Sequence, residues 1–455
     1  MSQSNAQGQK QFLGHPVGLF VLFFTEMWER FSYYGMRALL VLYMTKYLIN
    51  HAQTGGYVFG FGVLKAGLEA VFGPLAIQPM ASQIYGLYTG FVYFTPFFGG
   101  ILADRFFGQR KTVVLGGILM AIGHFLMAFE QFFLLALLFL ILGNGCFKPN
   151  ISTQVGNLYP AGDPRRDGAF TIFYMGINLG AFFSPLVCGT LGQVYGWHYG
   201  FTAAGVGMVI GLVVYLWGQK YLAQDNLTLN ISNKAAAEPL KHEEIQGIIA
   251  LVVLCMLNIV FWAVYEQQGN TIQLFADQNT DWHLFGWEMP STWFQSLNPL
   301  FIFLLAPLLN LFWSGQAKKG KEPTSVGKMA LGCFLLGMSF LVLMYVSHGL
   351  AADQKITFLW LVGCTLIYTI GELYLSPIGL SLVTKVAPAR LVSMLMGMWF
   401  LSSFFGNYLS GYIGSYYEKM PKEAFFLLLT VLGVGAGASM LLLKTRLKKA
   451  LGEAG

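Results

Sequence analysis

The sequence predicts an all-α polytopic membrane protein, and three observations carry that prediction. Of the 455 residues, 55% are hydrophobic and only 11% are charged, and the mean hydropathy is +0.58. A soluble protein needs more charge than this to cover its surface. Apolar segments of about 20 residues, the length that crosses a bilayer, recur along the chain. Lys and Arg residues gather in alternate short loops, as they do on the cytoplasmic side of helical membrane proteins.

Twelve segments have the length and apolar character of a membrane-spanning helix. A Gly-rich, partly amphipathic stretch at about 49–79 separates the first from the second. The expected spans lie near 17–48, 80–103, 111–130, 132–158, 168–192, 198–221, 247–275, 290–313, 325–348, 356–384, 390–416 and 422–444.

The spans divide into two sets of six around a polar stretch at 222–246 that is typical of a linker. Loops rich in Lys and Arg fall on the side of this linker and of both chain ends, so both termini are expected in the cytoplasm. The expected parts are a tail at 1–16, an N-terminal six-helix bundle at 17–221, the linker at 222–246, a C-terminal six-helix bundle at 247–444 and a tail at 445–455.

The two halves also resemble each other at short stretches. Gly143 and Pro149 in the fourth span have the same spacing as Gly371 and Pro377 in the tenth. Together with the six-plus-six arrangement, this favours two related bundles around a central cavity, as in many secondary carriers.

The first span carries a polar stripe. At about 100° per residue, its charged and tyrosine side chains fall within an arc of roughly 140° on one face. These residues are Glu26, Glu29, Arg30, Tyr33, Tyr34 and Arg37. A charge left in hydrocarbon costs roughly 2.5–3.5 kcal/mol even on a lenient scale, so the stripe must face other helices or water.

Three more ionisable residues, Lys148, Glu266 and Glu372, lie deep in later spans. With the four charges of the first span they make four acids and three bases, a set with one net negative charge. Binding one proton would neutralise it, which suits a site that couples proton movement to another event. The alternative is that these groups only pair to lock the bundle, although apolar packing would do that at lower cost.

The sequence gives no reason to expect a nucleic acid, a metal or an organic cofactor as a ligand. The net charge of +6 is accounted for by the basic loops, so no nucleic-acid partner is expected. The five cysteines are scattered through apolar segments without ligand spacing, and we expect no metal and no cofactor apart from the proton.

The first-span pattern Glu26-x-x-Glu29-Arg30-Phe31-x-Tyr33-Tyr34-Gly35 resembles the signature of the proton-coupled oligopeptide transporters, a family of the major facilitator superfamily. Further stretches resemble family positions across essentially the whole chain. They lie at 100–108, 143–150, 173–181, 294–299 and 371–377.

The resemblance implies a role for each matching residue. Proton coupling would involve Glu26, Glu29, Arg30 and Glu266. Arg37 and Lys148 would attract the carboxylate of a peptide and Glu372 its ammonium group. The backbone of the peptide would bond to Asn178 and Asn298, and its side chains would meet Tyr33, Tyr34, Tyr88, Trp399 and Ser403.

The resemblance also implies that Arg37 and Glu266 form a gating salt bridge, with Lys148 and Glu372 as the second gating pair. It implies a proton-driven importer of di- and tripeptides in the bacterial cytoplasmic (inner) membrane, acting by alternating access and as a monomer. Two departures stand out: the linker is too short for the two extra helices of many bacterial members, and the second span has no histidine, which animal members use.

Three alternatives stay open. The same fold could serve a proton-coupled carrier of another small solute or of drugs. A membrane-embedded enzyme is disfavoured, because no nucleophile–base pair or His/Asp cluster has helical spacing in the membrane. A passive channel would move solute only downhill and would ignore the proton gradient.

Overall fold

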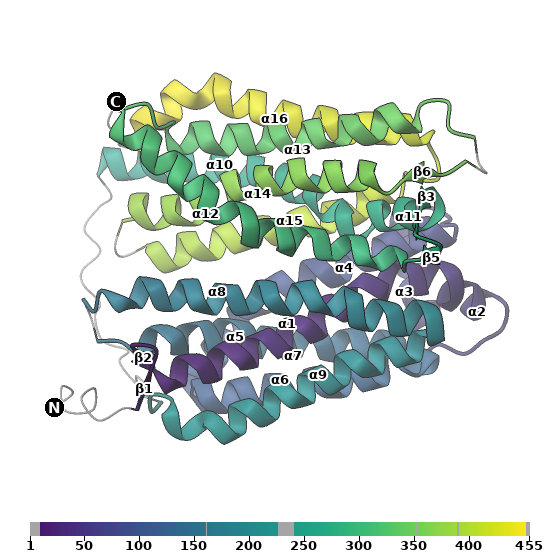
Figure 1. Cartoon of the computed structure of the whole chain (residues 1–455), viewed down its shortest axis with the longest axis horizontal. Coiled ribbons are helices and arrows are strands. Elements are labelled where there is room, and N and C mark those ends of the chain that lie inside the picture. The colour runs from purple at the N-terminus through teal and green to yellow at the C-terminus, as the bar shows by residue number, and fades with distance from the viewer. Residues whose placement is uncertain (1–9, 161, 226–240, 352–353, 389–390, 452–455) are drawn as a thin grey trace. The chain divides into compact units, whose positions relative to one another are not determined.

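The computed structural model describes residues 10–160, 162–225, 241–351, 354–388 and 391–451, and these are overwhelmingly helical (Figure 1). The first part of the chain forms β1 (Gln11–Phe12), β2 (His15–Pro16), α1 (Val17–Tyr43), α2 (Ile49–Gln53), α3 (Phe61–Phe72), α4 (Ile77–Phe94), α5 (Pro96–Leu102), α6 (Gln109–Leu126), α7 (Phe133–Asn157), α8 (Arg165–Ser184) and α9 (Trp197–Gly218).

The later part forms α10 (His242–Tyr265), α11 (Thr271–Gln278), β3 (Thr280–Asp281), β4 (His283–Leu284), β5 (Trp287–Glu288), α12 (Leu297–Lys318), α13 (Ser325–Ser347), β6 (Ile356–Thr357), α14 (Leu359–Val386), α15 (Val392–Gly414) and α16 (Lys422–Ala450). The helix α10 begins at His242, five residues before the span expected at 247, and the bounds of the linker stay a prediction. Its residues 226–240 lie outside the described residues.

Nine helical stretches among the described residues are long and apolar enough to cross a membrane. They run over Ile77–Phe107, Glu130–Asn157, Arg165–Tyr195, Trp197–Tyr221, Glu244–Gln278, Ser291–Lys318, Ser325–Ser347, Leu359–Val386 and Lys422–Leu447. The other three predicted spans form the long helices α1, α6 and α15, which are less apolar. In α1 the cause is the charged stripe of the first span.

Several predicted spans are not uniform helices. The span that begins with α10 is interrupted by a 3₁₀ segment, Glu266–Gly269, before α11 continues it. Gln267 fixes this interruption, because its Nε2 donates to the backbone oxygen of Ser410 at 2.9 Å. The spans containing α1 and α5 end in π-helical segments at Met44–Leu48 and Ala103–Phe107, and the span containing α8 ends in two, Pro185–Gly189 and Leu191–Tyr195.

The short strands pair outside the long helices. Strands β1 and β2 form an antiparallel hairpin whose two-residue turn, Leu13-Gly14, has positive φ at both residues. The hairpin of β4 and β5 turns in the same way at Phe285-Gly286. Two positive φ values match the twist that a two-residue hairpin needs, and glycine takes the second position without steric cost. Strands β3 and β6 pair in parallel.

The chain forms two compact units, Met1–Gly73 with Phe91–Asn233, and Pro74–Gly90 with Lys234–Gly455. The division runs through α4, whose residues up to Gly90 pack with the second unit. The prediction of two six-helix bundles at 17–221 and 247–444 takes no account of this, and its boundaries stay predictions.

Glycines let the helices of each unit approach closely. In the first unit, a Cβ on Gly116 of α6 would lie 2.7 Å from the backbone oxygen of Gly143 on α7. In the second, a Cβ on Gly332 of α13 would lie 2.6 Å from the backbone oxygen of Gly371 on α14. Lipid gives membrane helices no hydrophobic driving force to associate. Small residues at the helix crossings instead allow close packing contacts.

Candidate functional site

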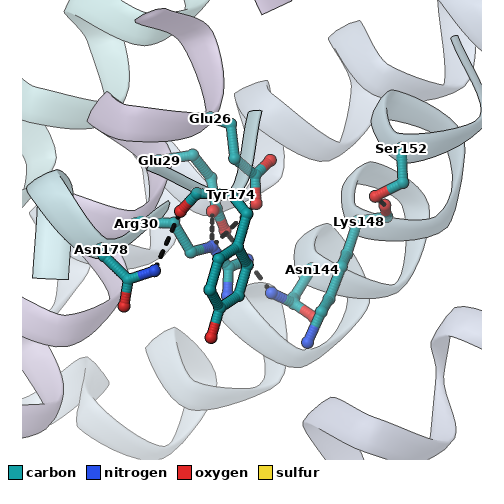
Figure 2. A network of polar contacts seen from close by, with 8 residues as sticks. All are labelled: Glu26, Glu29, Arg30, Asn144, Lys148, Ser152, Tyr174 and Asn178. Carbon is teal, nitrogen blue, oxygen red and sulfur yellow. Dashed lines mark hydrogen bonds and ion pairs between the residues drawn. The ribbon is translucent and has the colours of Figure 1, made fainter. Parts of the chain in front are cut away.

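The first unit buries a charged cluster on α1 (Figure 2). Glu26, Glu29 and Arg30 are 2%, 0% and 3% exposed. Both Nε and Nη2 of Arg30 donate to the carboxylate of Glu29, the second over 2.7 Å to Oε1. The Nε atom also lies 3.1 Å from Oε1 of Glu26. One guanidinium is therefore shared by two carboxylates of the same helix.

Two other helices face this cluster. Asn144 on α7 points its Nδ2 at Oε1 of Glu29 over 3.5 Å. Lys148 lies one turn further along α7, and its ammonium is 4.7 Å from the ring centre of Tyr93. Asn178 on α8 lies to the other side of the cluster in Figure 2, where its Nδ2 donates to the backbone oxygen of Tyr174 at 2.9 Å.

Close helix packing sets this arrangement. Helix α1 lies against α8 and α9 within the first unit (Figure 1). Gly180 on α8 faces the charged turn so closely that an added Cβ would overlap the backbone oxygen of Met27 and would come within 3.1 Å of the Arg30 Cβ. The glycine thus lets α8 pack directly against the charged turn of α1.

The aromatic part of the stripe continues along α1. The guanidinium carbon of Arg30 is 5.2 Å from the ring centre of Tyr33, and that of Arg37 is 5.9 Å from the ring centre of Tyr34. Cations at these distances are attracted to the face of the ring. Arg37 is 4% exposed. The two acids and the one base of the cluster and this second arginine are therefore all buried on one helix.

The second unit holds the other predicted residues. Asn298, at the start of α12, donates from Nδ2 to Oε2 of Glu372 at 2.9 Å and to Oγ1 of Thr369 at 3.0 Å. Glu266, 1% exposed, is the first residue of the 3₁₀ interruption after α10. Glu372 is partly exposed.

Trp399 and Ser403 lie one turn apart on α15 and are each 5% exposed. The Trp399 ring packs on Gly379 of α14, where a Cβ would overlap it. Tyr88, 2% exposed, lies in the part of α4 that belongs to the second unit. Arg37 and Lys148 belong to the first unit and Glu266 and Glu372 to the second, so the gating pairs stay predictions.

Sequence reasoning missed three residues that hold the predicted ones. Asn144 contacts Glu29, Thr369 contacts Asn298, and the hydroxyl of Tyr265 donates to Oδ1 of Asn298 at 3.4 Å. Helical spacing was an available signal for two of them, because Asn144 is four residues before Lys148 and Thr369 is three before Glu372. Tyr265 directly precedes Glu266 but offered no such signal.

Comparison with known proteins identifies the family. The sequence profile of the POT family matches residues 110–238 and 222–428. The chain is 35% identical to the "Uncharacterized transporter YclF" of Bacillus subtilis, over 97% of this chain and 96% of the relative. It is 35% identical to the "Peptide transporter YePEPT" of Yersinia enterocolitica over 91% and 90%. It is 32% identical to a "Di-/tripeptide transporter" of Lactococcus lactis over 98% of each chain.

Solved structures agree. A crystal structure of a peptide transporter of this family in complex with sulfate superposes with a TM-score of 0.81, at 34% identity and 97% coverage of each chain. A family transporter in complex with 5-aminolevulinic acid gives 0.83, at 29% identity and 96% and 98% coverage. The fold is therefore that of the major facilitator superfamily, and the chain belongs to the POT family of membrane transporters.

Proposed function

We propose that this protein is a proton-driven symporter that imports di- and tripeptides by alternating access. Family membership supports this, as do the relatives named peptide and di-/tripeptide transporters. The observation that carries the proposal is the buried cluster on α1, in which two carboxylates share one guanidinium. A buried group with this charge pattern can take up a proton and become neutral.

Within the cluster, Glu26 is the carboxylate that would lose the fewest contacts on taking up a proton. It makes one contact with Arg30, and its Oε2 has no hydrogen-bond partner among the described residues. Glu29 instead makes a two-point contact with Arg30 and a third with Asn144. A proton on Glu26 would leave the Arg30–Glu29 pair intact, so the guanidinium would never be buried without a partner.

The substrate would be held as a zwitterion. Lys148 and Arg37 would attract its carboxylate and Glu372 its ammonium group, while Glu266 would be a second protonation site that pairs with Arg37 when ionised. The remaining predicted residues would contact the peptide itself. These are Tyr33, Tyr34, Tyr88, Asn178, Asn298, Trp399 and Ser403.

The same proposal covers the protein's setting. It would lie in the bacterial cytoplasmic membrane with both termini in the cytoplasm, act as a monomer, and use protons as its coupling ion without a metal or organic cofactor. One proton moving through ~100 mV supplies about 2.3 kcal/mol. At about 1.4 kcal/mol per tenfold, that permits accumulation of a neutral zwitterion on the order of fifty-fold.

Uptake of labelled dialanine into proteoliposomes under an inward proton gradient tests the proposal. We expect gradient-driven uptake by the wild type and its loss in Glu266→Gln, with gradient-free counterflow exchange retained. Glu288→Gln, an exposed position on β5, is the matched control and should behave as wild type. Absence of dialanine uptake by folded wild-type protein under any gradient would remove the peptide assignment.

A second candidate is a proton-coupled carrier of another small zwitterion. It is favoured by the related structure that binds 5-aminolevulinic acid. Competition separates the two: a peptide carrier should be inhibited by dialanine and trialanine at lower concentrations than by 5-aminolevulinic acid, and the opposite order would favour the second candidate.

A further inference from the structure

The side-chain amide of Asn298 is held on three sides. Its two Nδ2 hydrogens are both used, one on Oε2 of Glu372 at 2.9 Å and one on Oγ1 of Thr369 at 3.0 Å. Its Oδ1 accepts from the hydroxyl of Tyr265 at 3.4 Å. An asparagine amide has two donor hydrogens, so none is left over for a substrate while these bonds persist.

The orientation of the Asn298 amide follows from the hydrogen bond that Thr369 itself donates. The hydroxyl of Thr369 donates to the backbone oxygen of Thr365 at 2.7 Å, so towards Asn298 it can only accept. That places the Asn298 nitrogen, rather than its oxygen, beside Thr369 and Glu372. The reversed amide would set Oδ1 against a carboxylate oxygen, two acceptors without a proton between them.

Three helices of the second unit build this arrangement. Thr365, Thr369 and Glu372 lie on one face of α14, at spacings of four and three residues. Asn298 is the second residue of α12, and Tyr265 is the last residue of α10. Thr369 and Tyr265 are 0% and 5% exposed, whereas Glu372 is partly exposed. The buried groups thus hold a carboxylate that can still meet a ligand.

We propose that Thr369 and Tyr265 are positioning residues for Glu372. They lock the Asn298 amide so that it presents an N–H to the carboxylate of Glu372, which holds that group in a fixed orientation for the ammonium group of a substrate. The N–H groups of Asn298 then hold Glu372, and the second lone pair of its Oδ1 remains for the peptide. This inference rests on the proposed function, in which Glu372 binds the amino terminus of a peptide.

The test compares three variants of the full chain in proteoliposomes: Thr369→Val, which keeps the shape and removes the hydroxyl, Thr369→Ser, which restores it, and Tyr265→Phe. We expect Thr369→Val to raise the KM for dialanine about tenfold with little change in the maximal rate, since a hydrogen bond to a charged group is at stake. Thr369→Ser should return the KM to near the wild-type value. Tyr265→Phe should raise it as well, because it removes the hydroxyl that donates to Asn298 and that also lies within hydrogen-bond reach of Glu372.

N-acetyl-alanyl-alanine, which lacks the ammonium group, distinguishes a positioning role of Thr369 from a merely structural one. A structural defect would weaken the binding of both ligands equally. The inhibition constant of N-acetyl-alanyl-alanine should be the same for wild type and Thr369→Val, whereas that of dialanine should rise.

Thr430→Val is the matched control. Thr430 is 6% exposed in the same unit and also donates to the backbone oxygen four residues earlier, but on α16. An equal loss for both ligands in Thr369→Val, or a failure of Thr369→Ser to restore dialanine uptake, would overturn the inference. If Thr369→Val does not fold, Tyr265→Phe decides by the same comparison of ligands. Absence of uptake by the wild type would instead overturn the proposed function, and the inference with it.

Discussion

Arg30 can lie inside a membrane-spanning helix because two carboxylates share it. Its contacts with Glu26 and Glu29 come from one helix, so the sequence alone could bring them together. The contacts of Asn144 with Glu29 and of Thr369 with Asn298 join helices distant in the sequence. Helical spacing places Asn144 and Thr369 near charged residues of their own helices, but it does not show which residue of another helix they contact. The charged residues were therefore predicted and the residues that hold them were not.

Replacing Arg30 by Lys should therefore be far from conservative. A lysine ammonium is a point charge and cannot make the two-point contact with Glu29 while also reaching Glu26. We expect Arg30→Lys to lower the stability of detergent-solubilised protein by about 2 kcal/mol and to abolish proton-driven uptake. Arg446→Lys, at an exposed position in the last turn of α16, is the control. Wild-type uptake by Arg30→Lys would show that the two-point geometry is dispensable.

A pH-dependent contribution to stability is expected at the loop before α8. Hydrogen bonds from the side chain and then the backbone N–H of Arg165 lower the pKa of Asp163 from 3.8 to about 2. A carboxyl group whose pKa is lower in the folded state stabilises it above its unfolded pKa, and this stabilisation is lost as the pH falls through the folded pKa.

The melting temperature of Asp163→Asn should thus lie below that of wild type near pH 7, and the difference should shrink as the pH is lowered from about 5 towards 2. Arg165→Gln should reproduce the defect, and the double variant should be no worse than either single variant, because one interaction is lost in all three. A difference that stays constant across this pH range would refute the pairing.

At the scale of elements, the predicted spans match the helices closely because a run of about 20 apolar residues is a strong signal. The interruption at Glu266–Gly269 was not predictable in this way. Beyond it, Asn270 adopts φ −113° and ψ −97°, and its Oδ1 accepts from the hydroxyl of Ser82 at 2.9 Å. Gln78 donates to the same hydroxyl at 2.8 Å. The helix interruption is therefore accompanied by polar contacts with α4, which is remote in the sequence. A hydropathy pattern cannot reveal such contacts.

The contact between α4 and α15 predicts a steep cost for adding one methyl group. A Cβ on Gly86 would lie 2.6 Å from the Cα of Gly411, so backbone rather than a flexible side chain would have to move. We expect Gly86→Ala to destabilise the solubilised protein by about 1–3 kcal/mol, as overpacking does.

Gly435→Ala on α16 is the matched control, since a Cβ there meets nothing within 4 Å. Alanine is the better helix former, so that variant should be as stable as wild type or more stable by up to about 1 kcal/mol. Equal melting temperatures for Gly86→Ala and wild type would show that α4 and α15 pack less closely than described.

At the scale of the whole molecule, composition and loop charge predicted the membrane class and the number of spans. They could not show that α4 packs with the second unit as far as Gly90, because that follows from the glycine contact with α15. Nor could composition and loop charge identify the transported substrate. The proposed one rests on the first-span pattern, on the buried cluster and on the relatives.

The central claim, that peptide and proton move together, is tested most directly by following protons. Proteoliposomes with a pH-sensitive dye in the lumen, an inside-negative membrane potential and no initial pH difference would receive external dialanine. We predict acidification of the lumen that requires both the protein and dialanine, and that is absent in Glu266→Gln. Entry of labelled dialanine without any acidification would contradict the account.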